Sequence, residues 1–171
     1  IGTKAGYGST NSKLDNSTFI GTNSGKSIFI SKDSTFNGYA VGYKANRSYS
    51  STFIGAYSAY NIINSNNNLF IGDKTGFNID YGDNNTLIGS EAGLVLSGGQ
   101  GGSSDNILIG SQAGYNLISG TNNVLFGTGS ASYNLRSNNQ MVIGNYITGK
   151  GNGTLTIGIN WGGNNVLDTV Y

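Results

Sequence analysis

The sequence predicts an all-β fold, a repetitive β-solenoid or parallel β-roll of about ten coils of roughly 17 residues each. Three observations predict it. An apolar residue followed by glycine recurs along the whole chain. The apolar runs are only three or four residues long and rich in Ile, Phe and Val, as in short strands. Clusters of Asn, Ser and Gly bound each run, as in turns.

The recurring pair defines the predicted coils. We expect the residue before each glycine to fill the coil interior and the glycine to form a corner, because glycine adopts positive φ without strain. The predicted core residues are Ile20, Val41, Ile54, Ile71, Ile88, Ile109, Phe126, Ile143 and Ile157. The predicted corners are Gly21, Gly42, Gly55, Gly72, Gly89, Gly110, Gly127 and Gly144. Seventeen is the commonest interval; the interval from 89 to 110 is four residues longer, a loop insertion, and that from 42 to 55 is four shorter, a loop deletion.

A column of asparagine stands five residues before the glycine. Its members are Asn16, Asn37, Asn67, Asn84, Asn122 and Asn139, with Ser50 and Asp105 as variants. Stacked asparagines can bond side chain to side chain along the solenoid axis, and asparagine also tolerates turn conformations. Both interpretations remain open from the sequence.

A second apolar column predicts self-association. Neighbouring residues of a strand face opposite sides, so one of the two apolar positions before glycine requires a cover outside the coil. A further copy of the chain is the simplest cover, and a three-fold bundle would bury the stripe. The candidate interface residues are Phe19, Phe53, Phe70, Leu87, Leu108, Leu125 and Val142. In the alternative, both positions straddle a corner and point inward.

The repeats divide the chain into two predicted parts. Residues 1–158 form the solenoid repeat domain, and residues 159–171, which contain the only Trp, form an atypical terminal repeat or cap. Because Ile1 already stands inside a repeat, we expect the chain to be a fragment of a longer protein.

The amino-acid composition argues against most kinds of catalytic and metal-binding site. The chain has no His and no Cys, so nucleophilic and acid–base catalysis by these residues is absent, as are the usual ligands of zinc. Asp80 and Asp83 are the closest carboxylate pair, and they stand in a predicted turn. The net charge of +1 gives no field for nucleic acid, and no apolar run is long enough to span a membrane. We therefore predict no enzymatic activity, no cofactor and no metal.

The unit Ile-Gly-x-x-Ala-Gly-Tyr at residues 1–7 and 109–115, with Asn-Asn leading into the next strand, resembles the head repeats of trimeric autotransporter adhesins and the related repeats of phage-type tail-fibre proteins. The resemblance covers residues 1–158. It implies a left-handed parallel β-roll, a homotrimer and a role in attachment. The 17-residue period is somewhat longer than that of adhesin heads, and no coiled-coil stalk is present.

These observations favour a structural and adhesive segment of a fibre that is extracellular, on a cell surface or on a virion. Its partners would be copies of itself, as a homotrimer or filament, and a surface glycan or host receptor. The glycan-contact candidates are Tyr43, Tyr49, Tyr57, Tyr81 and Tyr146, which otherwise pack between neighbouring coils. Two alternatives remain open: a monomeric solenoid that binds glycan or ice, and a subunit of a polymerising extracellular filament. The column Thr18, Thr52 and Thr86 is too interrupted for a regular ice-binding surface.

Overall fold

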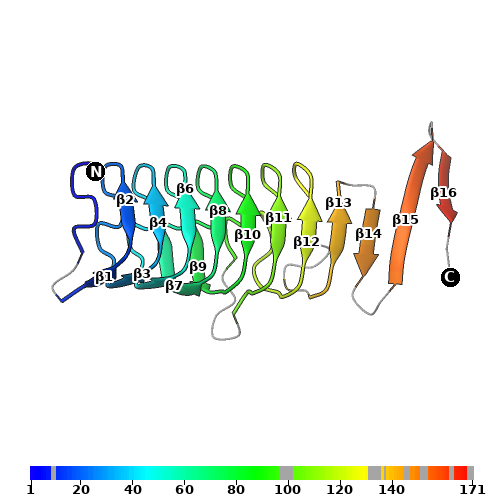
Figure 1. The fold of residues 1–171 in the computed structure, drawn as a ribbon. Coiled ribbons are helices and arrows are strands. Elements are labelled where there is room, and N and C mark those ends of the chain that lie inside the picture. Colours follow the sequence, from blue (N-terminus) through cyan, green and yellow to red (C-terminus); the bar gives the residue numbers. More distant parts are fainter. Residues whose placement is uncertain are drawn as a thin grey trace.

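The computed structural model describes residues 1–8, 11–96, 102–130, 136, 138–144, 147–150, 154–161 and 164–168. Within these residues the protein consists of strands and turns, without a helix, and forms a β-solenoid of about seven turns (Figure 1). The predicted fold class and period are therefore confirmed, with fewer coils than the ten expected. Seven coils stacked at about 4.8 Å make a rod about 34 Å long.

Two sheets line the rod. Sheet A contains β1 (Lys13–Asp15), β3 (Ile30–Lys32), β5 (Arg47–Tyr49), β7 (Asn61–Asn66) and β9 (Asn78–Tyr81). The parallel strands of sheet B are β2 (Thr18–Ile20), β4 (Thr35–Asn37), β6 (Thr52–Ile54), β8 (Leu69–Ile71), β10 (Thr86–Ile88), β11 (Ile107–Ile109), β12 (Val124–Phe126) and β13 (Met141–Ile143). A third side, which we call the turn face, joins each sheet B strand to the next sheet A strand through residues 2–8, 21–29, 38–46, 55–60 and 72–77 (Figure 1).

Each coil stacks on the next with residues in register 17 apart. Phe36 of β4 lies between Phe19 of β2 and Phe53 of β6. The longer interval between β10 and β11 leaves the register intact, because Leu87 pairs directly with Leu108. The loop insertion itself, residues 97–101, lies outside the described residues.

The third coil corrects the predicted register. Asn37 of β4 pairs with Ile54 of β6, so the corner of this coil is Gly38, with φ of 141°, and neither Val41 nor Gly42 occupies the predicted position. Every interval from Gly21 to Gly89 is then 17 residues, and the predicted loop deletion does not exist. Val41 is nonetheless buried, because it points inward from the turn face.

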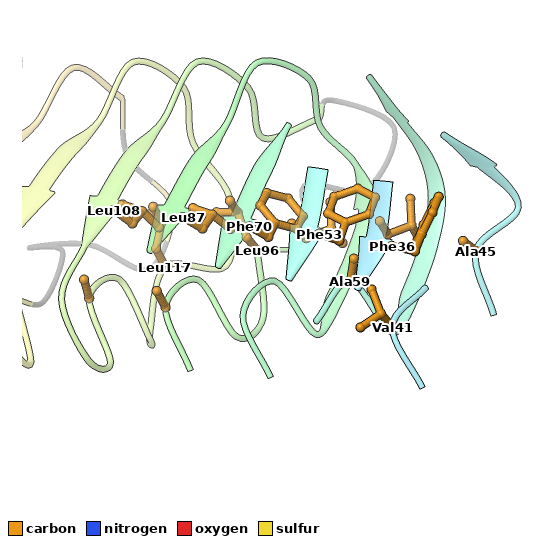
Figure 2. Packing of buried hydrophobic residues seen from close by; sticks show 14 of the residues in the cluster. Phe36, Val41, Ala45, Phe53, Ala59, Phe70, Leu87, Leu96, Leu108 and Leu117 are labelled. Atoms are coloured by element: carbon orange, nitrogen blue, oxygen red, sulfur yellow. The ribbon is translucent and has the colours of Figure 1, made fainter. Parts of the chain in front are cut away.

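The core contains a row of large side chains from sheet B and, facing it, a second row made of Ile28, Ala45, Ile62, Ile79, Leu96 and Leu117 (Figure 2). In each three-residue strand the central side chain points inward and the two outer ones point away. The buried central residues are Phe36, Phe53, Phe70, Leu87, Leu108, Leu125 and Val142, and none is more than 2% exposed. The phenylalanine rings pack in succession with centroids 4.9 to 5.2 Å apart.

This core reverses two predictions. The candidate interface residues Phe53, Phe70, Leu87, Leu108, Leu125 and Val142 fill the interior, and Phe19 is half-buried at the first coil. The predicted core residues of β2, β6, β8, β10, β11, β12 and β13 lie on the outer surface instead, and Ile20, Ile54 and Phe126 are 37%, 36% and 52% exposed. The physical reason is the alternation along a strand: when the middle residue is inside, both of its neighbours are outside.

The corner glycines are required by close backbone approach. At Gly72, with φ of 142°, an added Cβ would lie 2.5 Å from the carbonyl oxygen of Gly89 in the next coil. The same approach recurs at Gly21, Gly38, Gly55, Gly89 and Gly110. The predicted corner at Gly144 differs, because its φ is 57°.

Asparagine at the corner between the two sheets serves both functions considered from the sequence. The positions Asn16, Asp33, Ser50, Asn67, Asn84, Asp105, Asn122 and Asn139 all have φ between 49° and 59°, so Asp33 takes the place that was predicted for Asn37. Side chains also bond along the axis, since the amide of Asn16 donates to Asp33 over 3.0 Å and that of Asn84 donates to Asp105 over 3.1 Å.

Parallel stacking ends at β13. The strands β14 (Ile147–Lys150), β15 (Thr154–Trp161) and β16 (Asn164–Asp168) continue sheet B as an antiparallel meander (Figure 1). Ile157 therefore belongs to an antiparallel strand, pairing with Ile147 and Asp168, and is no part of a stacked coil. The atypical terminal region begins after Gly144, earlier than the predicted boundary at 158.

Candidate functional surfaces

The outer face of sheet B carries two parallel columns of side chains. The first column contains Thr18, Thr35, Thr52, Leu69, Thr86, Ile107, Val124 and Met141. The second contains Ile20, Asn37, Ile54, Ile71, Ile88, Ile109, Phe126 and Ile143. None of these positions is charged. We call this surface the outer sheet B face.

Apolar character increases along this face. The coils of β2, β4 and β6 present threonine beside Ile20, Asn37 and Ile54. From β11 onward both columns are fully apolar, and Ile107, Phe126 and Met141 are 42%, 52% and 38% exposed. A continuous apolar stripe of this length exceeds the scattered apolar exposure of an ordinary monomer surface.

The turn face carries a row of stacked aromatic rings. Tyr43, Tyr60 and Phe77 occupy equivalent positions in three successive coils, with centroids 5.1 and 4.9 Å apart and planes within 8°. Lys26 occupies the same position in the preceding coil, where its Nζ donates to the hydroxyl of Tyr43 over 2.7 Å and lies 4.8 Å from the ring centroid. Both faces of the Tyr43 and Tyr60 rings are therefore covered by neighbouring coils, and all three rings remain partly exposed.

Two further tyrosines extend this row. Tyr39 and Tyr57 meet edge to face with centroids 5.3 Å apart, and Tyr57 lies 5.9 Å from Tyr60. Tyr39 is 47% exposed, so it keeps much of its ring accessible. Partial burial and the neighbouring Tyr39 raise the pKa of Tyr57, whereas the hydrogen bond from Lys26 lowers the pKa of Tyr43. The two hydroxyls thus stand in electrostatically different surroundings.

The five predicted glycan-contact tyrosines do not form one site. Tyr43 and Tyr57 lie on the turn face, whereas Tyr49 and Tyr81 lie on β5 and β9 of sheet A. Tyr146 falls outside the described residues. Packing between coils, the alternative considered from the sequence, accounts for Tyr43, whose ring stacks on Tyr60. Tyr39 and Tyr60 complete the cluster and were missed, because neither stands out in the sequence from the other tyrosines.

In the described part of the chain, several of the carboxylates take part in the stacking of the coils. Asp83 accepts hydrogen bonds from the backbone and side-chain nitrogens of Asn66, at 2.8 and 3.0 Å, and so supports the coil stacking. Among the described residues, no three carboxylate, imidazole or thiol groups gather where a metal ion could bind. A search of the same residues for a long apolar helix able to cross a membrane found none.

A buried polar column was not predicted. It follows the corner asparagines by one residue and contains Ser17, Ser34, Ser51, Asn68, Asn85, Asn106, Asn123 and Gln140. From Ser17 to Asn123, each side-chain oxygen accepts the backbone N–H of the equivalent residue in the next coil, as Asn68 does from Asn85 over 2.7 Å; the side-chain oxygen of Gln140, the last member, has no such partner among the residues described. The Asn-Asn pairs of the sequence carry this signal, since the second residue of each pair recurs every coil.

Comparison of the chain with protein-family models, with curated proteins and with solved structures gave no significant match. The functional argument therefore depends on the two surfaces: the uncharged outer sheet B face and the aromatic turn face.

Proposed function

We propose that this chain is a structural and adhesive segment of an extracellular or virion surface fibre, in which identical copies associate through the outer sheet B face. The observation that carries the proposal is the pair of uncharged outer columns, which become wholly apolar from β11 onward. Burial of such a stripe is the main driving force that protein association uses. The resemblance to trimeric adhesin heads and tail-fibre repeats implies three copies.

A second copy is the partner that fits this face best. Its side chains repeat with the same rise of about 4.8 Å, so every coil of one copy can meet an equivalent coil of another. The gradient along the face favours parallel, in-register association, because apolar coils then meet apolar coils and threonine coils meet threonine coils. In the stacked coils, the charged residues that the structure describes stand on sheet A, on the turn face or at the corners, where association leaves them in water.

The decisive experiment pairs two substitutions of matched exposure. Ile107 lies on the outer sheet B face and is 42% exposed, whereas Ile63 lies on β7 of sheet A and is 39% exposed. We expect light scattering to give the wild-type chain a mass near three times 17.8 kDa. Ile107→Lys places a charge in the interface and should reduce the mass toward that of the monomer, whereas Ile63→Lys should leave it unchanged.

The other outcomes discriminate between the alternatives. Open-ended species larger than a trimer would replace the fibre segment by a polymerising filament built from the same face. A monomeric wild-type chain would overturn self-association and favour a single solenoid that binds glycan or ice. Loss of assembly in both variants would show that the outer sheet B face has no special part in it.

A further inference from the structure

Charge is distributed unevenly along the rod. Residues 1–50 contain six basic and two acidic residues, a net charge of +4, whereas residues 51–105 contain one basic and five acidic residues, a net charge of −4. The chain as a whole carries only +1, so the average conceals a positive end and a negative middle. A surface partner that reaches the first coils therefore meets a positive field.

Three of the cations gather on the turn face. Lys4, Lys26 and Lys44 stand in the turn-face segments 2–8, 21–29 and 38–46 of successive coils, and the hydrogen bond from Lys26 together with the three positive charges lowers the pKa of Tyr43. Lys26 donates to that hydroxyl, and the Nζ of Lys44 lies 5.9 Å from the ring centroid of Tyr60. Each lysine comes from a different coil, so the positive groups follow one another along the axis.

Aromatic surface adjoins these cations. The ring contacts connect Tyr43 to Tyr60, Tyr60 to Tyr57, and Tyr57 to the 47% exposed Tyr39. Beyond Tyr57 the turn face carries Asp73 beside Lys74, so the run of lysines without a neighbouring carboxylate ends there. Exposed rings offer apolar contact to the C–H faces of sugars, and ammonium groups bind carboxylate or sulfate.

We propose that the turn face formed by Lys4, Lys26, Lys44, Tyr39 and Tyr57 binds an acidic polysaccharide, a chain of sugars bearing carboxylate or sulfate groups. A linear polymer fits better than a small anion, because each of the first three coils offers one cation, and these follow one another along the rod. The exposed Tyr39 ring favours sugar over nucleic acid, whose charge density calls for more cations than three. This inference specifies the ligand class of the adhesive role proposed above and rests on that role.

The test uses alginate, a polyuronate, with dextran as the uncharged polysaccharide. We expect calorimetry to detect binding of alginate that weakens with added salt, and no binding of dextran. The double variant Lys26→Gln/Lys44→Gln should bind alginate about tenfold more weakly, since each exposed charge contact is individually modest. Tyr39→Ala should weaken binding while leaving its salt dependence unchanged.

The matched control is Lys32→Gln, an exposed lysine on β3 of sheet A, which should bind as the wild type does. Equal losses in Lys32→Gln and the double variant would mean that net charge alone attracts alginate, and would overturn the site. Equally tight binding of single-stranded DNA would replace the proposed ligand class by any polyanion. If alginate fails to bind while light scattering still gives a trimer, the ligand is wrong and the fibre proposal stands.

Discussion

Replacement of Asn85 by alanine tests the buried polar column. Asn85 is fully buried, and its side-chain oxygen accepts from the backbone and side-chain nitrogens of Asn106, at 3.1 and 2.9 Å. Its amide donates to the carbonyl of Ser103 over 2.7 Å. Alanine removes all three bonds and leaves the backbone N–H of Asn106 and the carbonyl of Ser103 buried without these partners. At about 1–3 kcal/mol for each buried group, the free energy of unfolding should fall by about 4 kcal/mol.

Two further variants make the magnitude interpretable. Asn85→Ser should cost about half as much, because the hydroxyl of Ser51 already accepts the N–H of Asn68 over 3.1 Å at an equivalent position. Asn84→Gly changes the exposed neighbour, whose φ of 59° suits glycine, and should cost no more than about 0.5 kcal/mol. Urea unfolding followed by circular dichroism, at one protein concentration, measures all three. If Asn85→Ala costs as little as Asn84→Gly, the column contributes nothing to stacking and the reasoning is refuted.

Two other predictions concern single contacts. Gly72→Ala should destabilise the protein by about 3 kcal/mol or more, because the added Cβ would overlap the carbonyl of Gly89. The control is Gly129→Ala, which should cost only about 1 kcal/mol, because no atom lies within 4 Å of the new Cβ and φ is 64°. Equal losses of both variants in urea unfolding would contradict the close approach at Gly72. Lys26→Met removes the ammonium that lowers the pKa of Tyr43, so that pKa should rise toward its ordinary value in an ultraviolet or NMR titration, and an unchanged titration would show that the hydrogen bond does not form in solution.

The sequence was sufficient for the fold class because periodicity is a property of the chain itself. A 17-residue repeat of short apolar runs leaves few architectures other than stacked coils. It was insufficient to distinguish inside from outside, since alternation separates two faces without indicating which is buried. Asn37 contained the missing information: an amide in the column before glycine is tolerated on the outer surface and would be costly inside.

The error of register and the error of facing therefore have one origin. An apolar residue was expected before every corner glycine, so the corner of the third coil was predicted at Val41 and Gly42 and not at Asn37 and Gly38. Asn37 was thereby left out of the column of residues that precede the corner glycines. The candidate surfaces were harder to predict for another reason. The turn face brings together Lys26, Tyr43 and Tyr60 from separate coils. Which residues occupy the same position in successive coils can be recognised only when the register of the coils is correct.

The spacing of the side-chain hydrogen bonds allows whole coils to be added to the rod or removed from it. Within the part of the chain that the structure describes, the side-chain bonds that connect coils join residues 12, 14, 17, 18 or 21 positions apart, so each of these bonds connects neighbouring coils. Excision of residues 55–71 would join Ile54 to Gly72, the equivalent of Gly55, and would restore every ladder between the coils on either side. The rod would shorten by about 4.8 Å and otherwise keep its cross-section. Duplication or loss of single repeats in the gene is therefore a direct way to set the length of such a rod.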